Sequence, residues 1–400
     1  MPTRALSPQR RTPTVATLLA AMLMSLGLLS PPAVADVRPD QQWYLDAMKA
    51  SELWKVTRGE GVTVAVIDSG VEPIPGLEGR LLPGKSFSTA DRDVHEDTIG
   101  HGTEMAALIA GSGAENGLRG LAPAAEILPL RTYITNDFFR SHKTLVEAIR
   151  YAAVSDAQVI NISQSLSGVS NETRAELQDA INEANERGKL VFAAAGNDGQ
   201  RAKRDYPSML PGVVAVGAVD KTGKVADFSN HGPHLTLSAP GVPGGTSQAS
   251  ALASATAALI WSKHPDWTNH QVLRVMIETT GRSELGEEPS MYLGHGIIRP
   301  AQVIVDGKGD PGPADKSPVF SKHFASLEAS RSPSPDAGSE SGETSPADSK
   351  GSEDQSQVTA QEKNGDGPPW TVIGIGAAVL AVVAVAVILV RRRSQAQPHI

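Results

Sequence analysis

The sequence predicts an α/β fold with a doubly wound, mostly parallel sheet and helices on both faces. Two observations lead to this class. Between residues 61 and 305, apolar runs of strand length alternate with helical segments, and such alternation implies right-handed crossovers between parallel strands. The run at 62–67 is also nearly unbroken and rich in β-branched residues, which is typical of a strand buried on both faces.

The individual elements follow in chain order. After the first strand, further strands are expected at 125–130, 159–163, 190–195 and 213–219. Helices are expected at 144–155, at 171–187 with Asn171 as N-cap, directly after Ser247, and near 269–279, and the short segment 296–304 closes the domain. These elements define one domain at 61–305, which is long enough for a well-buried core.

Composition limits the remaining possibilities. The chain has 400 residues and a formal net charge of −8, which gives no indication of a nucleic-acid partner. It contains no cysteine, so disulfides and thiolate metal sites are excluded. Its stability must therefore come from packing, even if it is exported.

The N-terminus reads as a targeting segment. Residues 1–35 combine early arginines, an uncharged apolar stretch and the small residues Ala33-Val34-Ala35, as in a signal peptide cleaved before Asp36. An uncleaved anchor is the alternative, and the break at Pro31-Pro32 disfavours it. Residues 36–60 are too few for a domain, and their apolar residues predict an amphipathic N-terminal arm lying on the body of the protein.

The C-terminus changes character after residue 305. Residues 306–369 are dominated by Ser, Pro, Asp, Glu and Gly, which predicts a disordered linker. Residues 370–390 begin with a tryptophan and then carry no charge over a length that spans a bilayer core as a helix. The arginines of the tail 391–400 place that tail in the cytoplasm. The sequence thus predicts a single-pass cell-membrane protein whose folded domain is extracellular.

Three glycine-flanked residues are candidates for chemistry. Asp68 ends the buried strand, where parallel sheets place functional groups, although Asp-Ser-Gly is also an ordinary turn. His101 stands between two glycines at the start of a helix. Ser247 follows Gly244-Gly245-Thr246 in the first turn of an Ala-rich helix, where it is equally well a helix cap or a nucleophile near unpaired N–H groups. Together, an acid, a base and a hydroxyl favour nucleophilic catalysis.

These motifs resemble a known family. Val66–Gly70, Gly100–Ala106 and Gly245–Ser250 are similar to the three signature blocks of the subtilisin-like serine proteases, in that family's Asp, His, Ser order. Ala194–Asn197 resembles its fourth block, and the resemblance covers residues 60–280. It implies a subtilisin-like fold with Asp68, His101 and Ser247 as triad and Asn197 in the oxyanion hole.

The resemblance also implies a substrate-binding set made of segments beside the nucleophile: Ser163, Gln164, Ser165, Ala195 and Gly196. Two departures stand out. Ala251 replaces the proline that usually follows the serine block, and Gln164-Ser165 replaces a segment that ends in glycine. Asn161 is interpreted as a structural residue that holds its strand and the following turn together. No cofactor is implied, and the scattered carboxylates have no spacing that specifies a calcium site.

The overall layout is similar to that of the mycosins, the membrane-anchored subtilases of actinobacterial type VII secretion systems, although mycosins often carry disulfides. This resemblance implies a membrane-anchored endopeptidase that cleaves exported proteins, with protein or peptide substrates and a type VII membrane complex as partners. Two alternatives stay open: a structural component of a secretion complex that uses the protease fold as a docking body, and a general degradative surface protease.

Overall fold

A seven-stranded parallel sheet forms the centre of the computed structural model, which describes residues 39–88, 92–132, 141–200, 205–241, 243–281 and 289–331. The strands lie in the order β2-β3-β1-β4-β6-β8-β9, and every neighbouring pair is parallel. They comprise β1 (Thr63–Asp68), β2 (Lys85–Ser86), β3 (Glu126–Arg131), β4 (Val159–Ile162), β6 (Leu190–Ala194), β8 (Val213–Val219) and β9 (Leu235–Pro240). The predicted α/β class with a mostly parallel sheet is confirmed.

The sequence explains why these strands lie inside the domain. Every residue of β1, β4, β6, β8 and β9 is buried, as expected for strands covered on both faces. The antiparallel pair β5 (Leu166–Ser167) and β7 (Asp205–Tyr206) lies apart from the main sheet.

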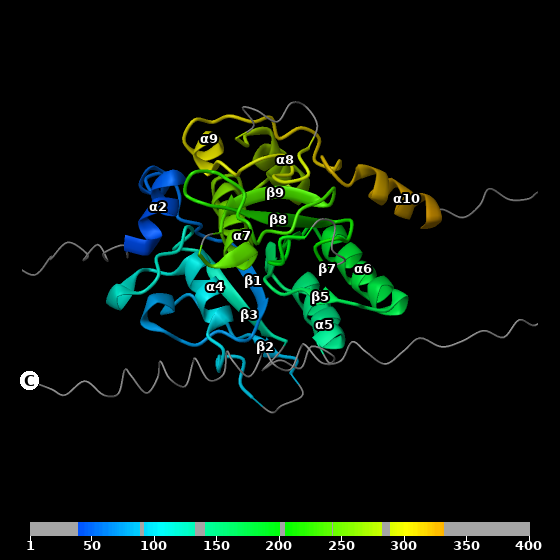
Figure 1. The fold of residues 1–400 in the computed structure, drawn as a ribbon, viewed down its shortest axis with the longest axis horizontal. Coiled ribbons are helices and arrows are strands. Elements are labelled where there is room, and N and C mark those ends of the chain that lie inside the picture. The colour runs from blue at the N-terminus through cyan, green and yellow to red at the C-terminus, as the bar shows by residue number, and fades with distance from the viewer. Residues whose placement is uncertain are drawn as a thin grey trace, which may run out of the picture. The chain divides into compact units, whose positions relative to one another are not determined.

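Helices cover both faces of the sheet (Figure 1). They create two apolar clusters. One cluster contains α4 (His101–Ala110), α7 (Gly245–Lys263), α8 (Asn269–Glu278) and α9 (Pro300–Ile304). The other contains α5 (Ser141–Val154) and α6 (Asn171–Glu186). Of its 19 residues, α7 buries Gly245 through Trp261, so its small side chains allow a whole helix to lie in the core.

The element boundaries differ from prediction in specific places. Ser170 caps α6 by accepting the Thr173 N–H, so the expected cap Asn171 is the first helical residue instead. Strand β9 was not expected, because its sequence Leu-Thr-Leu-Ser-Ala-Pro mixes polar residues into a buried strand. Thr268, which precedes α8, forms a capping box with Gln271.

The N-terminal arm lies on the same face as α4 and α7. It forms α2 (Pro39–Ala47) and α3 (Ala50–Leu53), with Tyr44 and Leu53 buried in that cluster. The indole N–H of Trp54 donates to the Leu121 carbonyl at 2.9 Å, which ties the arm to the domain.

The structure corrects the expected start of the disordered linker at residue 306. Residues 306–331 lie along the domain and end in α10 (Ser321–Arg331). Composition suggested disorder because few apolar residues are present, but Val319 and Phe320 pack against the core. Side chains of α8 supply further support, since Gln271 and Arg274 donate to the carbonyls of Gly312 and Lys316.

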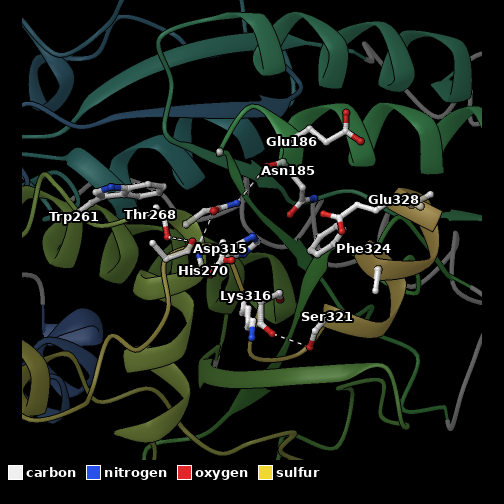
Figure 2. A pocket seen from close by; sticks show the side chains of 16 residues that line it. Asn185, Glu186, Trp261, Thr268, His270, Asp315, Lys316, Ser321, Phe324 and Glu328 are labelled. Carbon is white, nitrogen blue, oxygen red and sulfur yellow. Dashed lines mark hydrogen bonds between the residues drawn. The ribbon is translucent and has the colours of Figure 1, made fainter. Parts of the chain in front are cut away.

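A pocket lies where α6, the start of α8 and this C-terminal segment meet. Figure 2 shows Asn185 and Glu186 of α6 lining it together with Phe324 and Glu328 of α10. None of the predicted catalytic or substrate-binding residues lines this pocket.

Several predictions fall outside the described residues: the signal peptide 1–35, the linker beyond residue 331, the transmembrane helix 370–390 and the tail 391–400. Within the part of the chain that the structure describes, none of the helices combines the length and apolar character needed to cross a bilayer.

Candidate active site

Asp68 and His101 meet at the carboxyl edge of the sheet. Asp68 is the last residue of the central strand β1 and is fully buried, and His101 is the first residue of α4. His101 Nδ1 lies 2.8 Å from Asp68 Oδ1. Because an ionised carboxylate only accepts hydrogen bonds, Nδ1 carries the proton and Nε2 is the basic nitrogen. This is the tautomer that a general base needs.

Local sequence explains how the start of α4 comes so close to β1. A Cβ atom on Gly102 would lie 2.1 Å from the Gly70 carbonyl oxygen and 3.0 Å from the Asp68 Cβ. Any residue other than glycine would therefore push the helix, and His101 with it, away from Asp68.

Asp97 fixes the turn that delivers His101, and sequence reasoning missed it. Its carboxylate accepts the N–H groups of Gly100 and Thr103 at 2.8 and 2.9 Å and the Ser69 hydroxyl at 2.8 Å. Ser69 Oγ in turn accepts the Gly102 N–H at 3.0 Å. An isolated aspartate four residues before the histidine of a loop carries no periodic signal, so only the fold reveals this network.

The two titratable groups respond to these contacts in opposite ways. Burial alone would lower the pKa of His101, but the charge and hydrogen bond of Asp68 outweigh it and raise that pKa above its ordinary value. Burial alone would raise the pKa of Asp97, but hydrogen bonds from Thr103, Ser69 and Gly100 hold it below its usual range.

Ser247 lies in the first turn of α7, as predicted, and is 7% exposed. Its hydroxyl donates to the Ser163 carbonyl oxygen at 3.1 Å, and the Ser163 hydroxyl donates to the Ser247 carbonyl oxygen at 3.4 Å. Among the described residues no hydrogen bond joins Ser247 to His101, because the Ser247 hydroxyl donates to Ser163 instead. Catalytic hydrogen bonds often form only when substrate is bound.

Asn197 is held beside Ser247 by the neighbouring residue Thr246. The Asn197 Oδ1 atom accepts both the N–H and the hydroxyl of Thr246, at 2.8 and 2.9 Å. Thr246 Oγ1 also accepts the Gly196 N–H at 3.1 Å. Since Oδ1 is occupied, the Nδ2 donor of Asn197 is the group left to face a substrate oxygen. Gly245, with φ of 85°, allows the approach, because a Cβ there would lie 2.9 Å from that Nδ2 atom.

The other predicted substrate-binding residues flank this arrangement. Ala195 and Gly196 continue from the end of β6 toward Asn197, and the Ala195 N–H donates to Val216 at 3.0 Å. Gln164 Oε1 accepts the Thr132 hydroxyl at 3.1 Å, and Ser165 leads into β5. The fold therefore gathers Ser163 and 195–197 around the start of α7.

Asn161 has the structural role that the sequence suggested, with different partners. It was expected to hold its own strand and turn, and its Nδ2 does donate to the Ser163 hydroxyl at 2.9 Å. Its Oδ1, however, accepts the hydroxyls of Ser250 and Ser254 at 2.8 and 3.2 Å, which joins β4 to α7. No group of three or more His, Asp or Glu side chains within the described ranges could hold a metal ion.

Comparison with known proteins places this geometry in context. The family model described as "Subtilase family" matches residues 59–296. A thermostable alkaline protease of Halalkalibacterium halodurans is 35% identical over 253 residues, which cover 60% of this chain and 66% of that protein. The chain thus spans just under two thirds of that relative's length.

Two solved structures are also similar. The MycP1 structure with its N-terminal propeptide removed has a TM-score of 0.61 at 30% identity, covering 68% of this chain and 99% of that one. The second is a structure of the serine protease MycP1, an essential component of the type VII (ESX-1) secretion system. It has a TM-score of 0.60 at 31% identity, covering 69% of this chain and 90% of that one.

Proposed function

The chain belongs to the subtilase family, and on that premise we propose that it is a serine endopeptidase that hydrolyses peptide bonds through an acyl-enzyme on Ser247. The observation that carries the proposal is the Asp68–His101 hydrogen bond of 2.8 Å, which fixes the basic nitrogen. Asn197, oriented by Thr246, supplies an oxyanion donor at the same helix terminus that presents the nucleophile.

The chemistry follows from these positions. Ser247 Oγ attacks the scissile carbonyl carbon while His101 Nε2 takes the hydroxyl proton. Asn197 Nδ2 and the Ser247 N–H donate to the developing oxyanion, since first-turn N–H groups have no intrahelical acceptor. His101 then returns the proton to the leaving amine, and a water activated by His101 hydrolyses the ester on Ser247. Asp68 orients His101 and stabilises the imidazolium throughout.

Turnover of a protein substrate tests this proposal. The full-length chain in detergent should cut an unfolded casein or a peptide library, and Ser247→Ala should abolish the cleavage. The variant Ser254→Ala is the matched control, because that serine lies two turns further along α7 and bonds Asn161 instead of a substrate. Cleavage that survives Ser247→Ala would contradict the assigned nucleophile.

We further propose that the protease works on exported proteins at the outer face of a cell membrane, in association with a type VII secretion complex. Support comes from the resemblance to MycP1, which is an essential component of a type VII (ESX-1) secretion system. Support also comes from the uncharged stretch within 370–390 followed by three arginines.

Truncation after residue 331 should release the enzyme from the membrane fraction. Retention of the truncated chain in that fraction would contradict anchoring by 370–390.

The docking-body alternative makes a different prediction. If the fold serves mainly as a structural component, secretion should survive Ser247→Ala and fail when the whole gene is deleted. If proteolysis is required, both changes should stop secretion. A general degradative role would instead appear as broad digestion of unfolded proteins with no secretion defect in either strain.

A further inference from the structure

The loop at 196–200 follows β6 and carries the oxyanion residue Asn197. Glycines at 196 and 199 both have positive φ, so the loop backbone has unusual freedom and needs outside contacts to define it. Thr246 orients the Asn197 side chain but touches the loop backbone only at Gly196. Another group must therefore set where the backbone of Asn197 lies.

Asn230 supplies those contacts from the segment between β8 and β9. Its backbone N–H donates to the Gly196 carbonyl at 2.9 Å, directly before Asn197. Its side-chain Oδ1 accepts the N–H groups of Asp198 and Gln200 at 3.1 and 3.0 Å, directly after Asn197. One residue thus bonds the loop backbone on both sides of the oxyanion residue.

A buried carboxylate fixes the orientation of this amide. Asn230 Nδ2 donates to Asp205 Oδ2 at 2.9 Å, and the two residues are only 1% and 2% exposed. Because Asp205 accepts from the NH₂ end, the carbonyl end of Asn230 must face the loop. The pair also lies against Gly196, where a Cβ would come within 2.3 Å of Asn230 Nδ2 and 2.7 Å of Asp205 Oδ2.

We propose that Asn230, oriented by Asp205, is a positioning residue for the oxyanion hole. It holds the 196–200 backbone so that Asn197 Nδ2 lies where negative charge develops on the substrate carbonyl. Displacement of a catalytic donor by about 1 Å can cost about 10²-fold in rate. The inference rests on the proposed function, since it concerns a residue that acts through Asn197.

Loss of the Asn230 side chain should displace the loop without unfolding it. The bond from the Asn230 N–H to Gly196 is made by the backbone and survives substitution. Two further backbone bonds also remain, from Gly199 N–H to the Phe228 carbonyl at 2.7 Å and from His231 N–H to the Gln200 carbonyl at 3.2 Å.

The test is a double-mutant cycle between Asn230→Ala and Asn197→Ala, with kcat and KM measured on a peptide substrate by the full-length chain. Asn230→Ala alone should lower kcat by about 10- to 100-fold while KM stays within about twofold. In the Asn197→Ala background, the same change should cost less than about threefold, because the donor that it positions is already gone. Equal losses in both backgrounds, or parent-like kcat for Asn230→Ala, would overturn the inference.

A matched control separates positioning from general stability. Asn269 lies in α8, away from the site, and is buried like Asn230. Its Nδ2 donates to the Lys189 carbonyl at 3.1 Å. Asn269→Ala should lower the thermal midpoint but leave kcat within about twofold. Rates are expressed per active site, counted by titration with a serine-directed phosphonate.

If Asn230→Ala does not fold, Asn230→Ser enters the same cycle with the same criteria. A parent chain without turnover refutes the proposed function itself, whereas an active parent with additive variants refutes only this inference.

Discussion

Replacing Thr246 by valine tests the oxyanion arrangement through one hydroxyl. Valine keeps the shape of threonine, and the backbone N–H of residue 246 still reaches Asn197 Oδ1. The change removes the Oγ1 contacts to Asn197 at 2.9 Å and to the Gly196 N–H at 3.1 Å. Each such bond contributes about 1 kcal/mol, and the buried Gly196 N–H is left without an acceptor.

The expected fall in kcat is smaller than the fall caused by complete loss of the oxyanion donor. In related enzymes, removing that donor lowers kcat by about 10²–10³-fold. Because one of the two bonds that orient Asn197 survives, we expect kcat to fall about 10- to 100-fold with KM within about twofold. The assay is steady-state peptide hydrolysis, normalised to titrated active sites.

Thr256→Val is the matched control on the same helix. Thr256 is equally buried, and its hydroxyl donates only to the Leu252 carbonyl at 2.9 Å. This variant should keep kcat within about twofold. If Thr246→Val behaved like Thr256→Val, the Thr246 hydroxyl would have no part in orienting Asn197, and the reasoning would be refuted.

Three further predictions follow from the described contacts. In the parent, kcat/KM should rise with pH as His101 loses its proton, with a pKa above the ordinary value of about 6.5, because only neutral imidazole is a base. Asp68→Asn should move this rise in kcat/KM to lower pH and lower the maximum kcat/KM by about 10⁴-fold. Thr268→Ala should lower the thermal midpoint more than Ser170→Ala, by calorimetry, because both lose a helix cap worth about 1 kcal/mol but Thr268 also bonds the C-terminal segment. Asp97→Asn should lower the free energy of unfolding at neutral pH, measured by urea denaturation. The difference in that free energy between variant and parent should narrow as pH falls below about 4, because protonation of Asp97 in the parent then removes the stability that its ionised carboxylate contributes. A difference in the free energy of unfolding that stayed constant with pH would contradict the Asp97 prediction. Equal drops in the thermal midpoint of Thr268→Ala and Ser170→Ala would contradict the helix-cap prediction.

The sequence predicted the parts of this protein that have strong local patterns. The β-branched apolar run at β1 is typical of a buried strand, and the motifs around Asp68, His101 and Ser247 resemble family signature blocks. The fold class followed from sequence and is confirmed, whereas the triad of Asp68, His101 and Ser247 stays a prediction. The hydrogen bond from the Ser247 hydroxyl to the Ser163 carbonyl was not expected.

What sequence could not predict depends on partners that are distant along the chain. Asp97 and Asn230 are single polar residues in loops, and their roles exist only because the fold brings Ser69 to Asp97 and Asp198 to Asn230. The segment 306–331 looked disordered by average composition, yet a few apolar contacts and bonds from α8 suffice to order it.

Covalent labelling of the nucleophile tests the central claim most directly. The full-length chain would be incubated with a peptidyl phosphonate directed at serine proteases, digested and mapped by mass spectrometry. The account predicts one stoichiometric adduct on Ser247, lost in Ser247→Ala and strongly slowed in Asp68→Asn, because His101 then favours the wrong tautomer. An adduct on another residue, or none under conditions that label a control subtilase, would contradict it.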